Sequence, residues 1–151
     1  GGEAPDGATL RATCFAPAQE QLDHTRIHFL AHLPPDRLLA ALRLSTAHVY
    51  YSYPFVLSWS LTEAMAAGCY IIGSDTAPLH DAITDGVNGR LLPFCDAAPL
   101  WDAMTAACRN PDGQAGMRAA ARATAVERFD AAKGVEAWLK LLAAMGVDLG
   151  P

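Results

Sequence analysis

Charge and aromatic rings are both scarce in this sequence of 151 residues: 18% are charged and 8% are aromatic. The formal net charge is −5 at pH 7, so the basic surface expected of a nucleic-acid-binding protein is missing. No apolar run reaches the ~18 residues that a membrane-spanning helix needs, and no signal peptide is recognisable. We therefore expect no nucleic-acid partner and a cytoplasmic location. A peripheral contact of the full-length protein with the inner membrane stays open.

Cysteine is sparse and scattered, and histidine shows no ligand spacing. The sequence has no CxxC pair, and none of its five histidines follows a metal-binding pattern on a helix. A secreted disulfide scaffold would be denser in cysteine, and a metal centre would cluster its ligands. We expect no metal site, and we expect the cysteines to be small buried apolar residues in a reducing compartment: Cys14, Cys69, Cys95 and Cys108.

Apolar residues, by contrast, are abundant, at 52% of the chain. A chain of this length forms one domain by the usual prior, but this apolar fraction is above the average for soluble domains. The sequence also does not begin with methionine. We expect it to be a piece of a longer protein, with a core that is completed by further neighbours.

Strand and helix signals alternate along the first two thirds of the chain. Residues 1–8 are rich in Gly, Pro and Asp and indicate a loop, and residues 10–22 indicate a helix interrupted by Pro17. The alternation predicts a Rossmann-like parallel sheet flanked by helices, with a helical C-terminal tail. The predicted strands are 26–30, 47–51, 70–73 and 90–92, and the predicted helices are 34–44, one around Glu63, 78–84, 97–109, 113–128 and 130–145.

The most informative stretch is Ser58–Asp75. Ser58 or Ser60 can cap a helix, because a serine oxygen accepts a hydrogen bond from the free N–H groups of the first turn. A run of small residues continues the helix, and Gly68 supplies a left-handed end. Tyr70 and the two isoleucines after it then indicate a strand buried on both faces.

Glu63 is the only charged residue between Arg43 and Asp75. A carboxylate in so apolar a run needs a partner, and the N-terminal region of a helix is where anionic ligands gather. In a parallel sheet, ligands bind beyond the carboxyl ends of the strands, which is where this helix begins. Either Glu63 binds a ligand, or it is a structural carboxylate bonded to the Ser52 or Ser60 hydroxyl or to loop amides.

Three motifs occur in a fixed order: Arg26-Ile-His-Phe-Leu-Ala31, Glu63-Ala-Met-Ala-Ala-Gly68 and Asp85-Gly-Val-Asn-Gly-Arg-Leu-Leu92. Together they resemble the C-terminal, donor-binding domain of family 4 glycosyltransferases, which have the GT-B fold. The resemblance covers roughly residues 20–145. It implies a truncated domain with three parts: a poorly matched leading segment (1–25), an α/β core (26–92) and C-terminal helices (96–146).

The resemblance implies roles for several residues in binding a nucleotide-sugar donor, which is a substrate, so no cofactor is expected. The Glu63 carboxylate would accept hydrogen bonds from both ribose hydroxyls. Backbone amides of Leu57, Ser58 and Trp59 would meet the diphosphate, and the Ser52 hydroxyl either meets a phosphate or ties the turn. Ala31 stands where the base approaches the backbone. The glycines of the turn at 85–89 have a structural role in left-handed backbone.

Two departures from the family pattern concern the donor site. The family carries a second acid eight positions before Glu63, but Phe55 stands there, and Val56-Leu57-Ser58 replaces the usual Gly-Phe-Gly. Phe55 is either a core residue or a ring that stacks on a sugar, whereas the Trp59 side chain is expected in the core. Packing is also expected for the large apolar side chains of the helical tail: Trp101, Trp138, Leu139, Leu141 and Leu142.

The other departure is at the N-terminus, where the family's opening strand and its Arg/Lys-bearing phosphate loop are not recognisable. In the family fold, two strands lie between those predicted at 26–30 and 47–51, and neither is recognisable here. Either the two predicted strands pair directly, or residues absent from this sequence fill the gap, or another chain fills it by self-association through the exposed sheet edge. We favour absent residues first and self-association second. We expect the acceptor, whether glycan, lipid or small molecule, to bind in a missing N-terminal domain. This fragment alone should therefore be inactive.

The function implied by the resemblance is transfer of a sugar from a nucleoside diphosphate donor to an acceptor, with retention of configuration and without a metal. The catalytic residues, the sugar, the base and the acceptor are not given by the sequence. Two alternatives stay open: a nucleotide-sugar epimerase of the same fold, and a non-catalytic binding domain in which Phe55 replaces an acid.

Overall fold

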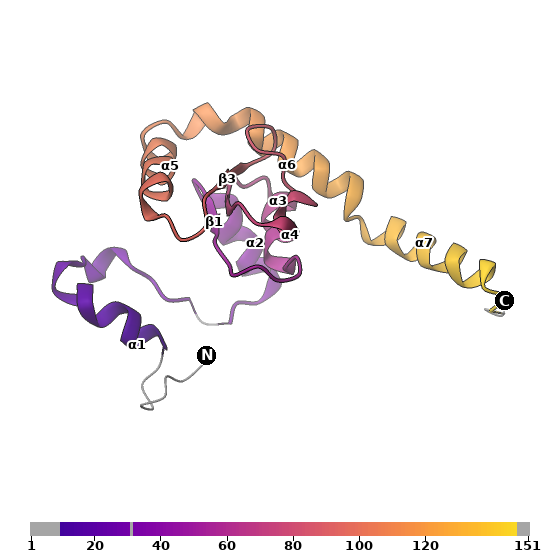
Figure 1. Cartoon of the computed structure of the whole chain (residues 1–151), viewed down its shortest axis with the longest axis horizontal. Coiled ribbons are helices and arrows are strands. Elements are labelled where there is room, and N and C mark those ends of the chain that lie inside the picture. Colours follow the sequence, from indigo (N-terminus) through magenta and orange to yellow (C-terminus); the bar gives the residue numbers. More distant parts are fainter. Residues whose placement is uncertain (1–9, 31, 148–151) are drawn as a thin grey trace. The chain divides into compact units, whose positions relative to one another are not determined.

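The computed structural model describes residues 10–30 and 32–147, so Ala31 lies outside the described residues. The chain divides into two units, residues 1–33 and residues 34–151 (Figure 1). The smaller unit contains the helix α1 (Leu10–Phe15) and the 3-10 helices η1 (Ala16–Gln21) and η2 (His24–Arg26). The helix predicted over 10–22 is thus split where Pro17 enters the first turn of η1, since proline lacks the N–H that would continue an α-helix.

The strand predicted at 26–30 is wrong. Arg26 ends η2, whose cap is the Asp23 carboxylate, which accepts a 3.0 Å hydrogen bond from the Thr25 N–H. Ile27 has extended backbone angles, but no strand pairing in the described part of the chain includes residues 27–30. A β-strand is stable only when a neighbouring strand satisfies its N–H and C=O groups, so a strand-like sequence pattern alone is not sufficient.

The larger unit is built on a parallel sheet of three strands, β1 (His48–Tyr50), β2 (Ile71–Ser74) and β3 (Arg90–Leu92), in the order β1-β2-β3. This confirms the predicted parallel α/β architecture and the three strands that follow the smaller unit. Every residue of the central strand β2 is buried. Its side chains alternate between the two faces of the sheet, which therefore both need cover.

Helices cover both faces of the sheet and continue into the C-terminal tail (Figure 1). On one face, the core joins Ile71 to residues of α2, α3, α4 and α6, with Leu61 and Met65 of α3 fully buried. On the other face, Ile72 packs with Leu92 and with Ala107 of α5. The helices are α2 (Pro35–Leu44), α3 (Trp59–Ala67), α4 (Ala77–His80), α5 (Ala97–Arg109), η3 (Pro111–Gln114), α6 (Ala115–Arg128) and α7 (Ala131–Ala144).

Three arginines of α6 bind backbone carbonyls at or just beyond the C-terminal ends of other helices. Arg118 donates to the carbonyls of Ser45 and Thr46 after α2, Arg122 to that of Ala66 in α3, and Arg128 to that of Asp81 after α4. The last carbonyls of a helix lack intrahelical partners and carry a partial negative charge. α6 thus fixes the positions of the helices that it crosses.

The glycine turn at 85–89 is structural, as the sequence predicts, but its two glycines serve different needs. Gly86 has φ +73°, the left-handed conformation. Gly89 does not have a positive φ; a Cβ there would lie 3.2 Å from the Ile71 carbonyl oxygen and 3.3 Å from the Ile71 Cβ. Close approach of two backbones therefore requires the second glycine.

The tail residues predicted to pack are mostly exposed. None of the residues of α7 is buried, and its Trp138 is 65% exposed. Trp101, on α5, is 69% exposed. Leu139 and Leu141 are also exposed, and Leu142 is half-buried. The apolar face of α7 is thus regular in sequence but uncovered by the rest of the described unit, which corrects the expectation of packing.

The cysteine expectation holds only for Cys69, which is 1% exposed and donates its S–H to the Leu42 carbonyl at 3.0 Å. Cys14, Cys95 and Cys108 are exposed, so the expectation of burial is wrong for these three. Within residues 10–30 and 32–147, no helix combines the length and the apolar character needed to cross a membrane.

Candidate functional site

The start of α3 has the geometry that the sequence predicts. Ser58 is the N-cap, with its Oγ accepting a 3.1 Å hydrogen bond from the Ser60 N–H, and the two hydroxyls lie 2.8 Å apart. At the other end, Gly68 has φ +78° and ends the helix in the left-handed conformation. Among the described residues, no acceptor faces the N–H groups of Leu57, Ser58 and Trp59. The helix start therefore presents unpaired donors.

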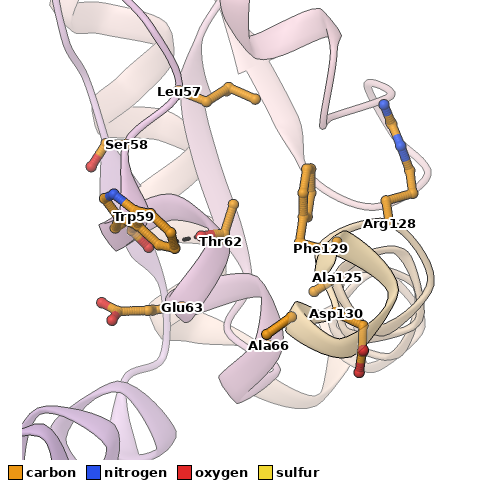
Figure 2. Close-up of a pocket in the computed structure, with 12 residues that line it drawn as sticks. Leu57, Ser58, Trp59, Thr62, Glu63, Ala66, Ala125, Arg128, Phe129 and Asp130 are labelled. Atoms are coloured by element: carbon orange, nitrogen blue, oxygen red, sulfur yellow. Dashed lines mark hydrogen bonds between the residues drawn. The ribbon is translucent and has the colours of Figure 1, made fainter. Parts of the chain in front are cut away.

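An open pocket of about 580 Å³ lies beside this helix start (Figure 2). One wall is the first two turns of α3 and the residues before them, and the other is the junction of α6 and α7. The lining residues are Leu57, Ser58, Trp59, Thr62, Glu63, Ala66, Ala125, Arg128, Phe129, Asp130, Ala131 and Gly134.

Glu63 is exposed and lines this pocket. The described part of the chain provides no hydrogen bond or ion pair to its carboxylate, and the alternative bonds to the Ser52 or Ser60 hydroxyl are not formed. Ser60 instead pairs with Ser58, and Ser52 uses its backbone carbonyl, which accepts a 3.3 Å bond from the buried Ser74 hydroxyl. Both oxygens of Glu63 are thus available to a ligand.

The loop between β1 and α3 is anchored to the segment after β3. The rings of Tyr51 and Tyr53 contact Phe94, with centroids 6.3 and 6.2 Å away. Tyr51 also donates a hydrogen bond to the Pro93 carbonyl at 3.1 Å. Burial and the nearby Asp96 carboxylate raise the pKa of Tyr51, so its phenol keeps the proton that it donates.

Neither Trp59 nor Phe55, the two aromatic residues at and just before the start of α3, lies in the core. Trp59, the first residue of α3, is 84% exposed, so the expectation of a buried indole is wrong. Phe55 is 75% exposed, so it is not a core residue. The alternative, a ring that stacks on a sugar, stays a prediction. Sequence alone favours burial for large rings, but which side of a helix start faces the core depends on the fold.

The structure brings together four of the predicted site residues: Leu57, Ser58, Trp59 and Glu63 all line the pocket, whereas Ser52 and Phe55 do not. The opposite wall was missed in the sequence. Arg128 lies there with its guanidinium carbon 5.6 Å from the centre of the Phe129 ring, and the Asp130 carboxylate caps α7. Of these features, only the capping of α7 by Asp130 can be predicted from the neighbouring residues in the sequence. The described residues contain no group of metal-ligating side chains that could hold an ion.

The sequence pattern of the family described as "Glycosyl transferases group 1" matches residues 9–124. The chain belongs to this family. Two of its relatives are the phosphatidyl-myo-inositol mannosyltransferase of Mycobacterium leprae, 43% identical over 70 residues, and the D-inositol 3-phosphate glycosyltransferase of Nocardia farcinica, 30% identical over 112 residues. These alignments span 46% and 73% of this chain, but only 18% and 25% of the relatives' own lengths.

Solved structures with low sequence identity have a fold similar to that of this chain. Sucrose-phosphate synthase from Thermosynechococcus elongatus matches 95% of this group 1 chain with a TM-score of 0.75 and 22% identity, over 38% of its own length. Anabaena HepE in complex with UDP-glucose matches 91% of the chain, again with a TM-score of 0.75, at 18% identity and over 39% of its length. The chain thus has the fold of the C-terminal part of a GT-B glycosyltransferase.

Proposed function

We propose that this group 1 domain is the nucleotide-sugar-binding part of a glycosyltransferase, and that Glu63 and the start of α3 hold the donor. The observation that carries this proposal is the exposed Glu63 carboxylate, which lines the pocket without a partner among the described side chains. One carboxylate can accept hydrogen bonds from two neighbouring hydroxyls, as a ribose presents them. The relative bound to UDP-glucose has the same fold, which supports a donor of this class.

The free N–H groups of residues 57–59 would bind the diphosphate. A helix start carries a partial positive charge, which stabilises an anionic ligand. In transfer, the bond between the sugar and the diphosphate breaks and negative charge grows on the leaving phosphate, so donors fixed at that position lower the barrier. This electrostatic role needs no metal ion. The names of the two curated relatives indicate glycosyl transfer, and we propose the same reaction for the full-length protein, with retention of configuration as the expected outcome.

Phe55 supports one alternative, because it occupies the position of the family's first acid and is exposed. A domain without that acid could bind a nucleotide sugar without transferring it. Both functions predict that the domain binds the donor, but only a transferase turns the donor over. Release of nucleoside diphosphate from the donor by the full-length protein, in the presence of candidate acceptors, distinguishes them.

The direct test is Glu63→Gln in the full-length protein, with donor binding followed by calorimetry. Replacing charge-assisted hydrogen bonds by neutral ones should cost about 1.5–3 kcal/mol, or roughly ten- to a hundredfold in affinity for UDP and UDP-glucose. Glu127→Gln is a matched control, since Glu127 is an exposed carboxylate outside the pocket. Equal affinities of the Glu63→Gln variant and the parent would remove the ribose role from Glu63.

A further inference from the structure

Trp59 exposes 84% of its surface at the first position of α3, an unusual place for so large an apolar side chain. Its backbone is fixed: the Thr62 hydroxyl donates a 3.0 Å hydrogen bond to the Trp59 carbonyl. Within the described residues, no aromatic ring packs on the indole. The position is therefore held, while the ring remains available.

The indole shares one face of α3 with Glu63. The two residues are four positions apart on the same helix, so their Cβ atoms lie about 5–6 Å from each other. Both line the same pocket, and Figure 2 shows the Trp59 ring next to the Glu63 carboxylate, across the pocket from Phe129. A ligand held by Glu63 thus has an aromatic surface within reach toward the helix start.

We propose that the face of the Trp59 indole packs against the sugar ring of the bound nucleotide-sugar donor. This inference rests on the proposed function, in which Glu63 holds the ribose and the amides of residues 57–59 hold the diphosphate. The sugar is attached to the diphosphate on the side away from the ribose. Trp59 belongs to the same helix start as those amides, whereas the base leaves the ribose in the other direction.

This arrangement also accounts for the residue at the position of the family's missing acid. Phe55 has no group that could accept a hydrogen bond from a sugar hydroxyl, and it does not line the pocket. The C–H face of a pyranose ring is apolar, and a large flat side chain binds such a surface over a wide area. Packing on Trp59 would thus replace a hydrogen bond to a carboxylate as the contact that recognises the sugar.

The test uses Trp59 as its own reporter. The chain has three tryptophans, and Trp101 and Trp138 are both exposed outside the pocket, so W101F/W138F leaves Trp59 as the single indole of these 151 residues. In the full-length protein with these two substitutions, the part of the emission change that a further Trp59→Phe substitution abolishes reports on Trp59. This part should be much larger with UDP-glucose than with UDP. GDP and GDP-mannose form a second matched pair of probes.

The affinities provide the second readout. Trp59→Ala should weaken binding of the sugar nucleotide roughly three- to tenfold, while the affinity for the matching nucleoside diphosphate stays within about twofold. Trp59→Phe should recover part of the loss, and Trp101→Phe should have no effect. Because the indole is exposed, thermal unfolding should be unchanged by each substitution.

Two results would overturn this inference: equal losses for diphosphate and sugar nucleotide in Trp59→Ala, or no loss for either. In both cases the parent protein still binds the diphosphate and still loses affinity through Glu63→Gln. Failure of the proposed function is different, because then neither pair of probes binds the parent protein at all.

Discussion

The Asn88 amide donates a 3.0 Å hydrogen bond to the Thr124 hydroxyl, which joins the turn before β3 to α6. Asn88 is 5% exposed, and its other bonds stay within the turn: it donates to the Ala82 carbonyl and accepts from the Thr84 N–H at 2.7 Å. Thr124 in turn donates to the Ala120 carbonyl. One side chain therefore holds the turn in shape and fixes it against the helix that forms the wall of the pocket.

Asn88→Ala should lower the free energy of unfolding by about 2–4 kcal/mol, because several buried groups lose their partner and each costs about 1–3 kcal/mol. Thr124→Val keeps the shape of the side chain and removes the bond to Asn88 together with the bond to the Ala120 carbonyl. It leaves the bonds of Asn88 to Ala82 and Thr84 intact, so it should cost less than Asn88→Ala. Urea unfolding of the three proteins measures the difference. The same cost for both substitutions would mean that the bonds within the turn contribute nothing.

Two glycines, one at the end of α3 and one in the first turn of α6, should change the stability of the chain in opposite directions when they are replaced by alanine. Gly68 has φ +78°, and a methyl group added there would have no atom within 4 Å, so Gly68→Ala meets strain and no clash, at about 1–2 kcal/mol. Gly116 is the second residue of α6, with equally open space and without a positive φ. Gly116→Ala should therefore stabilise the chain by up to about 1 kcal/mol. Opposite shifts of the melting temperature are expected, and shifts of the same sign would contradict the left-handed assignment.

Features that depend on neighbouring residues in the chain were predictable from sequence. The Ser58 cap, the Gly68 end and the small residues between them give α3 its bounds, because all of these act within a few residues. Asp130 likewise begins α7, with its carboxylate accepting from the Lys133 N–H at 3.1 Å. Glu63 was identifiable as a candidate site residue by its isolation among apolar residues, and its role stays a prediction.

Features that depend on distant parts of the chain were not predictable. The segment at 26–30, with polar Arg26 and His28 alternating with apolar residues, has the pattern of a strand. A strand also needs a hydrogen-bonded neighbour, which the local sequence does not encode. Trp59 was expected in the core, since nothing local shows which side of a helix start faces the sheet. Arg128 and Phe129 reach the pocket only because α6 packs on α3, a contact between segments far apart in sequence.

His48 gives the chain a pH dependence of known sign. Burial lowers the pKa of its imidazole from the usual value of about 6.5, so the unfolded chain takes up a proton more readily than the folded one. Its contribution to stability is therefore complete above pH 6.5 and is lost as the pH falls below that value. Denaturant unfolding between pH 7.5 and pH 5.5 should show a fall that is smaller in His48→Gln. The exposed His32 offers the control, and His32→Gln should keep the slope of the parent chain.

Phe55 tests whether the loop before α3 can accept the acid that other family members carry there. The ring is 75% exposed, so Phe55→Glu buries no charge, and the free energy of unfolding should change by no more than about 0.5 kcal/mol. Leu61, six residues further along and fully buried, sets the scale, because Leu61→Ala should cost about 2–5 kcal/mol. If Phe55→Glu destabilised the chain as much as Leu61→Ala does, the exposed position of the ring would be wrong. With stability unchanged, the same variant of the full-length protein can be assayed for donor turnover without a folding artefact. A rise in turnover would then show that the missing carboxylate limits the transfer step.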